Sequence, residues 1–374
     1  MILSIQCQEY LHCILAINIK GQRPDMRKIK VLHILNTGSY AGAENVVIAI
    51  IQQMKSQADG IYLSKDGNIK KYLEKHNIPF YPVNRLSVPN IRRAIQQIKP
   101  DIIHAHDFTA GILSTLSTHR IPVIIHVHSH PVWARNLTWK SLIFGISCIR
   151  YKKIITVSDS MMKEYIFGKC FLKKTISLGN PIDISAIRAK ALSASLAVPS
   201  DVVFLGRCAS PKNPLLFINI IKDLAERLPE VRAVMIGDGE LFQETKEQIQ
   251  AFGLDNNVHM YGFLENPYGL LHAGKILCMP SSLEGFPLAA LEALSLGKPV
   301  VASPVGGLKN IVTPDCGKLC RSQDDFVNEL YFLLSDKKNY QAKSKGALER
   351  AGKFSNIPDY SKIIYQIYFS ILYG

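Results

Sequence analysis

The amino-acid sequence predicts an α/β protein with room for two domains. Its 374 residues are enough for two domains of ordinary size. Hydrophobic residues make up 47% of the chain and charged residues 20%, which is a globular composition. Residues 276–307 place two short apolar runs on either side of a helical pattern, in the order strand, loop, helix, strand. This order is typical of one βαβ unit of a parallel sheet.

The loop of this unit predicts an anion pocket. It ends in Gly285, Phe286 and Pro287, directly before the apolar pattern that starts at Leu288. Pro287 suits the first position of a helix, because its missing N–H removes no intrahelical hydrogen bond. The backbone N–H groups of residues 285–288 are then free to face an anion, and the helix dipole adds positive potential there.

Two glutamates lie close to this pocket in the sequence. Glu284 directly precedes the glycine, and Glu292 lies two turns into the helix. A carboxylate beside an anion pocket repels phosphate, so both are better suited to bind hydroxyl groups attached to that phosphate. A ligand with sugars on both sides of a diphosphate fits this arrangement. Alternatively, Glu292 is a solvated helix residue and Glu284 interacts with the helix dipole.

The run from Glu284 to Leu288, followed by Glu292-Ala293, residues 297–303 and Gly306-Gly307, resembles the nucleotide-sugar site of the retaining glycosyltransferases of family 4. The resemblance extends over residues 28–370 and implies the GT-B fold, in which two Rossmann-like domains face each other across a cleft. It implies that residues 285–288 bind the donor diphosphate, that Glu284 contacts the transferred sugar and that Glu292 binds the ribose. It assigns no covalent nucleophile.

A first, acceptor-side domain is expected over residues 26–183. Residues 1–25 are interpreted as an extension outside the fold, because they lack the basic start and cleavage site of a secretion signal and precede a natural first strand. That strand leads into a glycine-containing turn, residues 36–44, which lets the backbone approach a ligand closely. By resemblance, Gly42 in this turn faces the donor diphosphate.

Histidines follow two predicted strands of this domain. Because ligands bind beyond the carboxyl ends of strands in open α/β sheets, His106 and Asp107 are better placed for function than His104, which is expected to be a hydrogen-bonded structural residue. Together with His126 and His128 these strand ends could make a metal site, but the resemblance argues against one. Many family members have a histidine in the position of His106, close to the transferred sugar. We therefore expect His106 in that role, with His128 as the second choice.

The excess positive charge lies in the first half of the chain. The net charge is +14, and residues 1–190 hold 26 basic and 11 acidic residues, against 18 and 19 in residues 191–374. This asymmetry favours contact with a polyanion or an anionic membrane surface. Nucleic acid is the weaker choice, because no helix-turn-helix, RNA-recognition signature or zinc finger accompanies the charge.

Residues 131–150 hold both tryptophans together with Arg135, Lys140 and Arg150. Tryptophan and basic residues beside aliphatic ones suit an interfacial helix on an anionic leaflet. A place for the aliphatic residues in the domain core is the alternative. No apolar run approaches the roughly 18 residues that span a bilayer, so an integral membrane protein is not expected.

Residues 184–200 are expected to form an interdomain helix and linker, after a segment in which Pro181 replaces a glycine common in the family. A donor-binding domain follows over residues 201–355. One of its strands ends in Arg207, and Lys212 comes five residues later, so both can reach one anion. By resemblance these two residues bind the donor diphosphate, while Gly262 and Phe263 contact the nucleotide base. The final helix, residues 356–374, is expected to pack back toward the first domain.

The eight cysteines are scattered without a Cys-x-x-Cys pair. No zinc site is therefore expected, and the cysteines within apolar runs are typical of buried thiols. This pattern indicates a reducing cytoplasm.

The resemblance and the charge together predict a hexosyltransferase-type enzyme. It would move a sugar, with retention, from a UDP- or GDP-linked donor to a glycan or polyprenyl-diphosphate-linked acceptor in cell-surface polysaccharide assembly. A cytoplasmic location is expected, on the inner face of the plasma membrane if the basic domain binds lipid. No metal or cofactor is required, because Arg207, Lys212 and the helix start supply positive potential and no Asp-x-Asp is present.

Other functions remain open. A nucleotide-sugar 2-epimerase shares the fold and the donor class, and a non-catalytic nucleotide-sugar-binding subunit is the non-enzyme alternative. A dehydrogenase is less favoured, since no strand is followed by Gly-x-Gly-x-x-Gly at the start of a helix.

Overall fold

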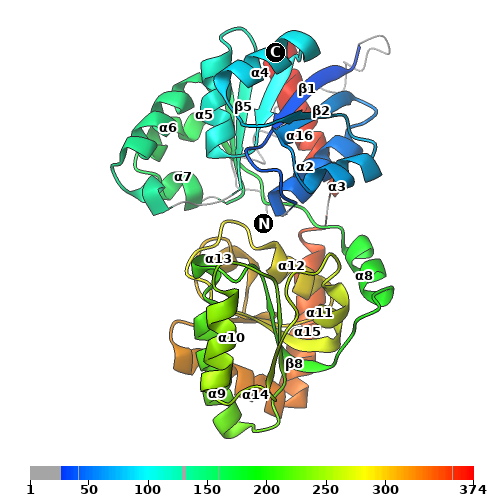
Figure 1. Cartoon of the computed structure of the whole chain (residues 1–374), viewed down its shortest axis with the longest axis vertical. Coiled ribbons are helices and arrows are strands. Elements are labelled where there is room, and N and C mark those ends of the chain that lie inside the picture. The colour runs from blue at the N-terminus through cyan, green and yellow to red at the C-terminus, as the bar shows by residue number, and fades with distance from the viewer. Residues whose placement is uncertain (1–26, 41, 129–131, 159, 356) are drawn as a thin grey trace. The chain divides into compact units, whose positions relative to one another are not determined.

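The computed structural model describes residues 27–40, 42–128, 132–158, 160–355 and 357–374. The chain divides into two compact units. Unit 1 comprises the chain up to Pro181 and the segment from Asn356 to the end, and unit 2 runs from Ile182 to Ser355 (Figure 1). The predicted extension, residues 1–25, lies outside the described residues.

Unit 1 is built on a parallel sheet of seven strands in the order β3-β2-β1-β4-β5-β6-β7. The strands are β1 (Ile29–Ile34), β2 (Ala58–Lys65), β3 (Phe80–Val83), β4 (Ile102–Ala105), β5 (Val123–Val127), β6 (Lys153–Thr156) and β7 (Thr175–Ser177). Every residue of β4 and β5 is buried, as expected for the centre of a sheet covered on both faces. The strand order reverses at β1, which pairs with β2 on one side and β4 on the other. The loops after β1 and β4 therefore border the crevice where open α/β sheets bind ligands.

The helices of unit 1 connect these strands and cover the sheet. They are α2 (Gly42–Gln53), α3 (Ile69–Lys75), α4 (Val88–Ile98), α5 (Phe108–Ser117), η1 (Val132–Arg135), α6 (Trp139–Arg150), α7 (Ser160–Glu164), η2 (Gly168–Lys174) and α16 (Ile357–Tyr373). The last of these, drawn in red in Figure 1, brings the end of the chain back to unit 1. Its Tyr368 hydroxyl lies 2.6 Å from Nδ1 of His104, so α16 packs on the histidine-bearing face of the sheet.

Unit 2 repeats this plan with a parallel sheet of six strands in the order β10-β9-β8-β11-β12-β13. The strands are β8 (Ser200–Leu205), β9 (Ala233–Ile236), β10 (Val258–Met260), β11 (Gly274–Met279), β12 (Val300–Ala302) and β13 (Gly317–Leu319). The helices are α8 (Ile184–Leu192), η3 (Ser210–Lys212), α9 (Pro214–Arg227), α10 (Phe242–Ala251), α11 (Tyr268–Ala273), α12 (Leu288–Ser295), α13 (Leu308–Ile311), α14 (Gln323–Ser335) and α15 (Lys337–Gly352). Here the order reverses at β8, which pairs with β9 and β11. The loops after β8 and β11 border the ligand crevice of this unit.

The predicted βαβ unit is confirmed as β11, α12 and β12, with one difference at the helix start. Pro287 is the residue before the first helical turn, not the first helical residue, because its ψ of 93° is extended. The predicted linker also differs. Its helix, α8, belongs to unit 2, where the Arg188 side chain donates a hydrogen bond to the carbonyl oxygen of Ser295 at the end of α12.

The described cysteines are free thiols. Five of them, Cys148, Cys208, Cys278, Cys316 and Cys320, are buried, as the apolar runs predict, while Cys170 is exposed. Within the described ranges, none of the helices combines the length and the apolar composition that a bilayer-spanning segment needs.

Candidate functional site

The candidate site of unit 2 is centred on an ion pair between the loops that follow β8 and β11. The Nζ atom of Lys212, at the end of η3, lies 2.6 Å from Oε1 of Glu284. The hydroxyl of Ser281 donates a second hydrogen bond of 2.8 Å to the same carboxylate oxygen. Glu284 is 6% exposed and Lys212 keeps a quarter of its side chain in solvent, so the lysine is the accessible member of the pair.

Glycines allow these loops to approach closely. The stem of Lys212 runs over Gly206, where an added Cβ would lie 3.6 Å from three of its side-chain carbons. Gly306 has a φ of +47°, and a Cβ there would lie 1.7 Å from the carbonyl oxygen of Glu284. The next residue, Gly307, donates its N–H to the carbonyl oxygen of Gly285 at 3.0 Å. The sequence pattern Gly306-Gly307 therefore holds the Glu284 loop against the loop that follows β12.

The start of α12 completes this arrangement. The helix begins at Leu288, and the residue before it, Pro287, makes no capping hydrogen bond with its side chain. The first N–H groups of a helix have no intrahelical partner, and the helix dipole gives them positive potential. The helix start therefore follows directly after the carboxylate that binds Lys212. It comprises Gly285, Phe286, Pro287 and Leu288, the residues at which the sequence predicts an anion pocket.

Arg207 lies in the loop that follows β8, two residues after the strand ends. Its side chain is exposed, and among the described residues its guanidinium takes part in no ion pair. It runs beside the turn after β9, where a Cβ added to Gly239 would lie 3.0 Å from Cγ of Arg207. Arg207 and Lys212 therefore flank the same loop, but only Lys212 contacts Glu284.

Glu292 is held by a residue that the sequence analysis does not single out. The hydroxyl of Tyr268, in α11, lies 3.0 Å from Oε1 of Glu292. Burial raises the pKa of the Glu292 carboxyl, while the Tyr268 hydrogen bond and the charges of Lys190 and Lys212 oppose that increase. The contact between Tyr268 and Glu292 could not be predicted from the sequence, because the two residues belong to different helices that only the fold brings together.

The two residues expected at the nucleotide base follow β10. Gly262 adopts a φ of +66°, and its carbonyl oxygen accepts a hydrogen bond of 2.8 Å from the N–H of Gly237. The ring of Phe263 is 59% exposed. An exposed aromatic ring beside a fixed backbone turn is suited to stacking on a flat ligand.

In unit 1 the residue expected near the sugar is buried. His106 is 1% exposed, and its two ring nitrogens lie 3.0 Å from Nδ1 of His33 and 3.3 Å from Nε2 of His128. This burial argues against a direct contact of His106 with a sugar. His128, the second choice, is the half-buried member of the group. His104 is hydrogen-bonded to Tyr368, as expected of a structural residue. Gly42 is exposed at the start of α2.

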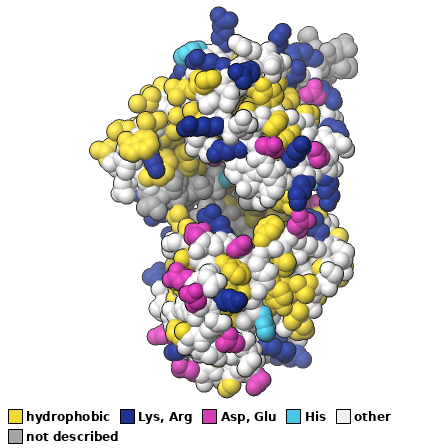
Figure 2. Space-filling view, in the orientation of Figure 1, with side chains coloured by type: hydrophobic (Ala, Val, Ile, Leu, Met, Phe, Trp, Pro, Cys, Tyr) yellow, Lys and Arg dark blue, Asp and Glu magenta, His cyan; other side chains and the backbone are white. Residues whose placement is uncertain are grey.

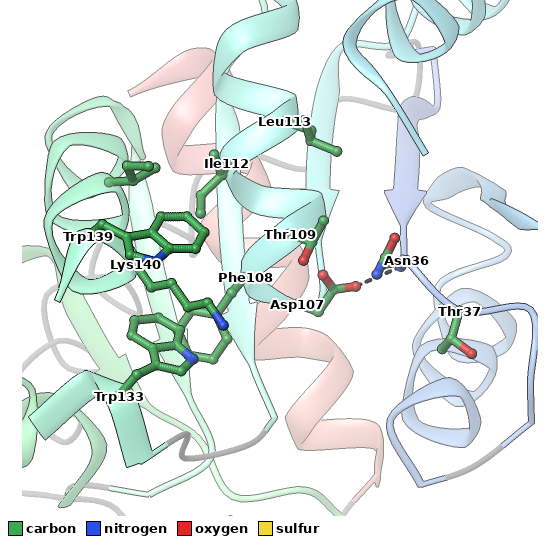
Figure 3. Close-up of a pocket in the computed structure, with 11 residues that line it drawn as sticks. Asn36, Thr37, Asp107, Phe108, Thr109, Ile112, Leu113, Trp133, Trp139 and Lys140 are labelled. Carbon is green, nitrogen blue, oxygen red and sulfur yellow. Dashed lines mark hydrogen bonds between the residues drawn. The ribbon is translucent and has the colours of Figure 1, made fainter. Parts of the chain in front are cut away.

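A pocket of about 600 Å³ opens beside the loops after β1 and β4 (Figure 3). One end is polar: the Asp107 carboxylate accepts hydrogen bonds from the N–H groups of Asn36 at 2.7 Å and Ala110 at 2.8 Å. The other end is formed by Trp133, Trp139 and the Lys140 side chain that lies between them in the view. The remaining lining residues are Thr37, Phe108, Thr109, Ile112, Leu113 and Ile143. Burial raises the pKa of the Asp107 carboxyl, and its backbone hydrogen bonds oppose this.

The surface next to this pocket is apolar. One face of α6 and the leucine before it expose large hydrophobic side chains, and hydrophobic atoms gather on this part of unit 1 in Figure 2. The exposed members are Leu137, Trp139, Leu142, Ile143, Ile146 and Ile149. We call these six residues the α6 patch. The sequence alone leaves open whether the aliphatic residues of this segment are core or surface, and the structure places these six on the surface.

Comparisons with known proteins fit both units. Residues 40–185 match the family model described as Glycosyltransferase Family 4, and residues 194–350 match the one described as Glycosyl transferases group 1. The two matches follow the division of the chain into unit 1 and unit 2.

Three curated relatives are identical to this chain at about a quarter of the aligned positions. The sulfoquinovosyl transferase of Arabidopsis thaliana is 26% identical over 74% of this chain. A Campylobacter jejuni alpha-1,4-N-acetyl-D-galactosaminyltransferase, named for an acceptor linked to PP-undecaprenol, is 25% identical over 71%. The UDP-Gal:alpha-D-GlcNAc-diphosphoundecaprenol alpha-1,3-galactosyltransferase of Escherichia coli is 25% identical over 83%. The aligned parts span 58%, 73% and 89% of these relatives.

Solved structures show the same fold. Anabaena HepE, in complex with UDP and glucose, superposes with a TM-score of 0.80 at 21% identity, covering 90% of this chain and 98% of HepE. A sucrose-phosphate synthase of Thermosynechococcus elongatus has a TM-score of 0.73 at 16% identity, covering 92% and 99%.

Proposed function

Because this chain is a family 4 glycosyltransferase with the GT-B fold, we propose that it transfers a sugar from a nucleotide diphosphate sugar to a lipid-linked oligosaccharide. UDP or GDP is the proposed leaving nucleotide, and cell-surface polysaccharide assembly is the proposed setting. The observation that carries the proposal is the Lys212–Glu284 pair at the start of α12. The names of two relatives, which specify acceptors linked through diphosphate to undecaprenol, support the acceptor class.

The donor diphosphate is proposed to lie between Lys212, Arg207 and residues 285–288. Lys212 is oriented before the donor arrives, because its ammonium group is bound to a buried carboxylate. Glu284 is proposed to accept a hydrogen bond from a sugar hydroxyl of the donor. Glu292, fixed by Tyr268, is proposed to accept hydrogen bonds from the ribose hydroxyls.

These groups are proposed to stabilise the negative charge of the leaving diphosphate. As the bond between the anomeric carbon and the donor phosphate oxygen breaks, negative charge grows on the diphosphate, and preorganised cations stabilise it. We propose that the acceptor hydroxyl attacks from the same face of the sugar and gives its proton to the leaving phosphate. The anomeric configuration is then retained, and no residue serves as a covalent nucleophile. The proposal gives no divalent metal a part in the transfer.

The acceptor is proposed to bind to unit 1. The pocket in Figure 3 joins an apolar wall of tryptophans to a polar end formed by Asn36 and Asp107, with Lys140 available for a phosphate. The α6 patch beside it is proposed to enter the interface of an anionic membrane, because exposed tryptophan and isoleucine next to basic residues suit that environment. Peripheral attachment at the cytoplasmic face would bring the pocket to a lipid-linked acceptor.

The test is a donor panel followed by product analysis. The purified protein is screened with nucleotide sugars by thermal shift, and the stabilising donors are incubated with membrane extract. We expect release of a nucleoside diphosphate together with a new sugar on the extracted lipid or glycan. An altered free nucleotide sugar would instead identify an epimerase, and tight donor binding without turnover would identify a non-catalytic subunit.

A further inference from the structure

Five histidines of unit 1 gather on one face of its sheet. They come from β1, β4 and β5 and from the residues after these strands: His33, His104, His106, His126 and His128. Neighbouring rings are close, with centroids 4.1 Å apart both for His104 and His106 and for His126 and His128. Four of the five side chains are at most 1% exposed, and His128 is half-buried. Glycosyl transfer as proposed above uses none of these rings directly.

Several ring nitrogens in this cluster have no hydrogen-bond partner among the described residues. They are Nε2 of His33, Nε2 of His104 and Nδ1 of His126, while the His128 side chain is hydrogen-bonded to Asn180. Buried polar atoms are normally hydrogen-bonded, so Nδ1 of His126, which faces His128 without a hydrogen-bond partner, calls for a ligand.

Three of the rings have the spacing of a metal site. His106, His126 and His128 each offer one nitrogen, and these nitrogens lie within 4.8 Å of one another. Nδ1 of His106 and Nε2 of His128 are 3.3 Å apart. Nitrogens bound to tetrahedral zinc at about 2.0–2.1 Å lie roughly 3.3–3.4 Å from each other, so this pair already has the separation of two zinc ligands.

We propose that unit 1 binds a first-row transition-metal dication of the zinc type through His106, His126 and His128. Second hydrogen bonds would orient two of these ligands, as is usual for metal-bound histidines. Nε2 of His106 lies 3.0 Å from Nδ1 of His33, and Nε2 of His126 lies 3.4 Å from the hydroxyl of Tyr360 in α16. His128 is the half-buried member of the three, so we expect the ion and a water ligand to enter on its side.

A second group in the cluster is less suitable. His33, His104 and His106 also offer nitrogens within 4.8 Å of one another. All three are at most 1% exposed, and Nδ1 of His104 is already held by Tyr368 at 2.6 Å. This group lies further from solvent, so His106, His126 and His128 form the more accessible set of ligands.

The experiment uses the full chain and Co²⁺ as the probe. After dialysis against a chelator, Co²⁺ is titrated in while the visible d–d absorption is recorded. We expect one ion per chain, with the intense bands of tetrahedral coordination and without the thiolate charge-transfer absorption that cysteine ligands produce. His126→Gln and, as a second variant at the half-buried position, His128→Gln should each abolish these bands. Tyr360→Phe should weaken binding by about tenfold, as loss of an outer hydrogen bond does.

Two exposed histidines provide matched controls, His119 in unit 1 and His259 in unit 2. His119→Gln and His259→Gln should bind Co²⁺ as the parent protein does, and circular dichroism verifies that each variant is folded. Absence of tetrahedral bands in the parent protein would overturn the proposal. Bands that survive both His126→Gln and His128→Gln, or that carry thiolate charge transfer, would overturn it equally. None of these readouts depends on glycosyl transfer.

Discussion

The Nζ atom of Lys212 lies 2.6 Å from Oε1 of Glu284, and this contact joins the loops that follow β8 and β11. Because β8 is the strand at which the sheet order reverses, the pair lies at the ligand crevice of unit 2. A buried carboxylate thus orients a cation that is one quarter exposed before any anion arrives. The donor chemistry that we propose depends on this relationship.

Removal of the lysine should reduce both stability and donor binding. In Lys212→Met the Glu284 carboxylate loses its cation and keeps the hydrogen bond from Ser281. We therefore expect the free energy of unfolding to fall by about 1.5–3 kcal/mol, the range for hydrogen bonds to charged groups. Urea denaturation measures this loss, and calorimetric titration with UDP and GDP measures the binding. Lys222→Met, on an exposed part of α9, is the matched control and should change neither quantity.

Gly306 should tolerate no side chain. Its φ of +47° disfavours alanine by about 1–2 kcal/mol, and the new methyl group would also meet the Glu284 carbonyl oxygen. Gly253 has a similar φ of +67° with open space around it, so Gly253→Ala separates the two effects. We expect Gly306→Ala to be more destabilising than Gly253→Ala in denaturant titrations and to weaken nucleotide binding. Equal losses in the two variants would show that the contact with Glu284 has no influence.

Glu292 should make stability depend on pH. Its pKa is raised in the folded state by burial, so the folded chain holds this proton more tightly than the unfolded chain, whose ordinary value is 4.5. The resulting stabilisation is complete below that value and is lost as pH rises through the raised pKa. The unfolding free energy of the parent protein, measured relative to that of Glu292→Gln, should therefore decrease from pH 4 upward.

Two variants sharpen this measurement. Tyr268→Phe removes a hydrogen bond that lowers the pKa of Glu292, so the pH window should extend to higher values. Glu244→Gln, on the exposed side of α10, should leave the pH profile unchanged. A profile that Glu292→Gln does not alter would show that the carboxyl titrates alike in the folded and unfolded chain.

Much of the fold could be predicted from the sequence, because the apolar runs of the strands are near-continuous and separated by glycine turns. The βαβ unit around Glu284 is the clearest case, and only the exact helix start at Pro287 differs. The contacts that fix the site could not be predicted in the same way. Tyr268 reaches Glu292, and Lys212 reaches Glu284, through pairings that depend on the order of strands in the sheet.

The histidines show the same limit in unit 1. Sequence spacing placed His106 at a strand end, which is correct, but whether its ring faces solvent or the interior depends on what covers that face of the sheet. The cover is α16, more than two hundred residues later in the chain, whose tyrosines contact His104 and His126. Burial of His106 therefore could not be predicted from its own neighbourhood.

The α6 patch should govern attachment to anionic vesicles. Ile146 and Ile149 are 65% and 70% exposed. Burial of an isoleucine side chain contributes about 1.5–3 kcal/mol, so replacing either by glutamate should weaken vesicle binding by about tenfold or more. Sedimentation with vesicles of increasing anionic lipid content measures the effect. Leu192→Glu, at an exposed leucine of unit 2, serves as the control. If vesicle binding by the parent protein does not increase with anionic lipid content, the membrane surface is excluded as a partner.

The central claim is that unit 2 holds the donor diphosphate with Lys212, Arg207 and the start of α12. Calorimetric titration of UDP and GDP into the parent protein, Arg207→Gln, Lys212→Met and the double variant tests it most directly, with Arg232→Gln as an exposed control in the same unit. We expect each single variant to lose about tenfold in affinity for the preferred nucleotide, the double variant to lose more, and Arg232→Gln to bind like the parent. Unchanged affinity in the double variant would contradict the account.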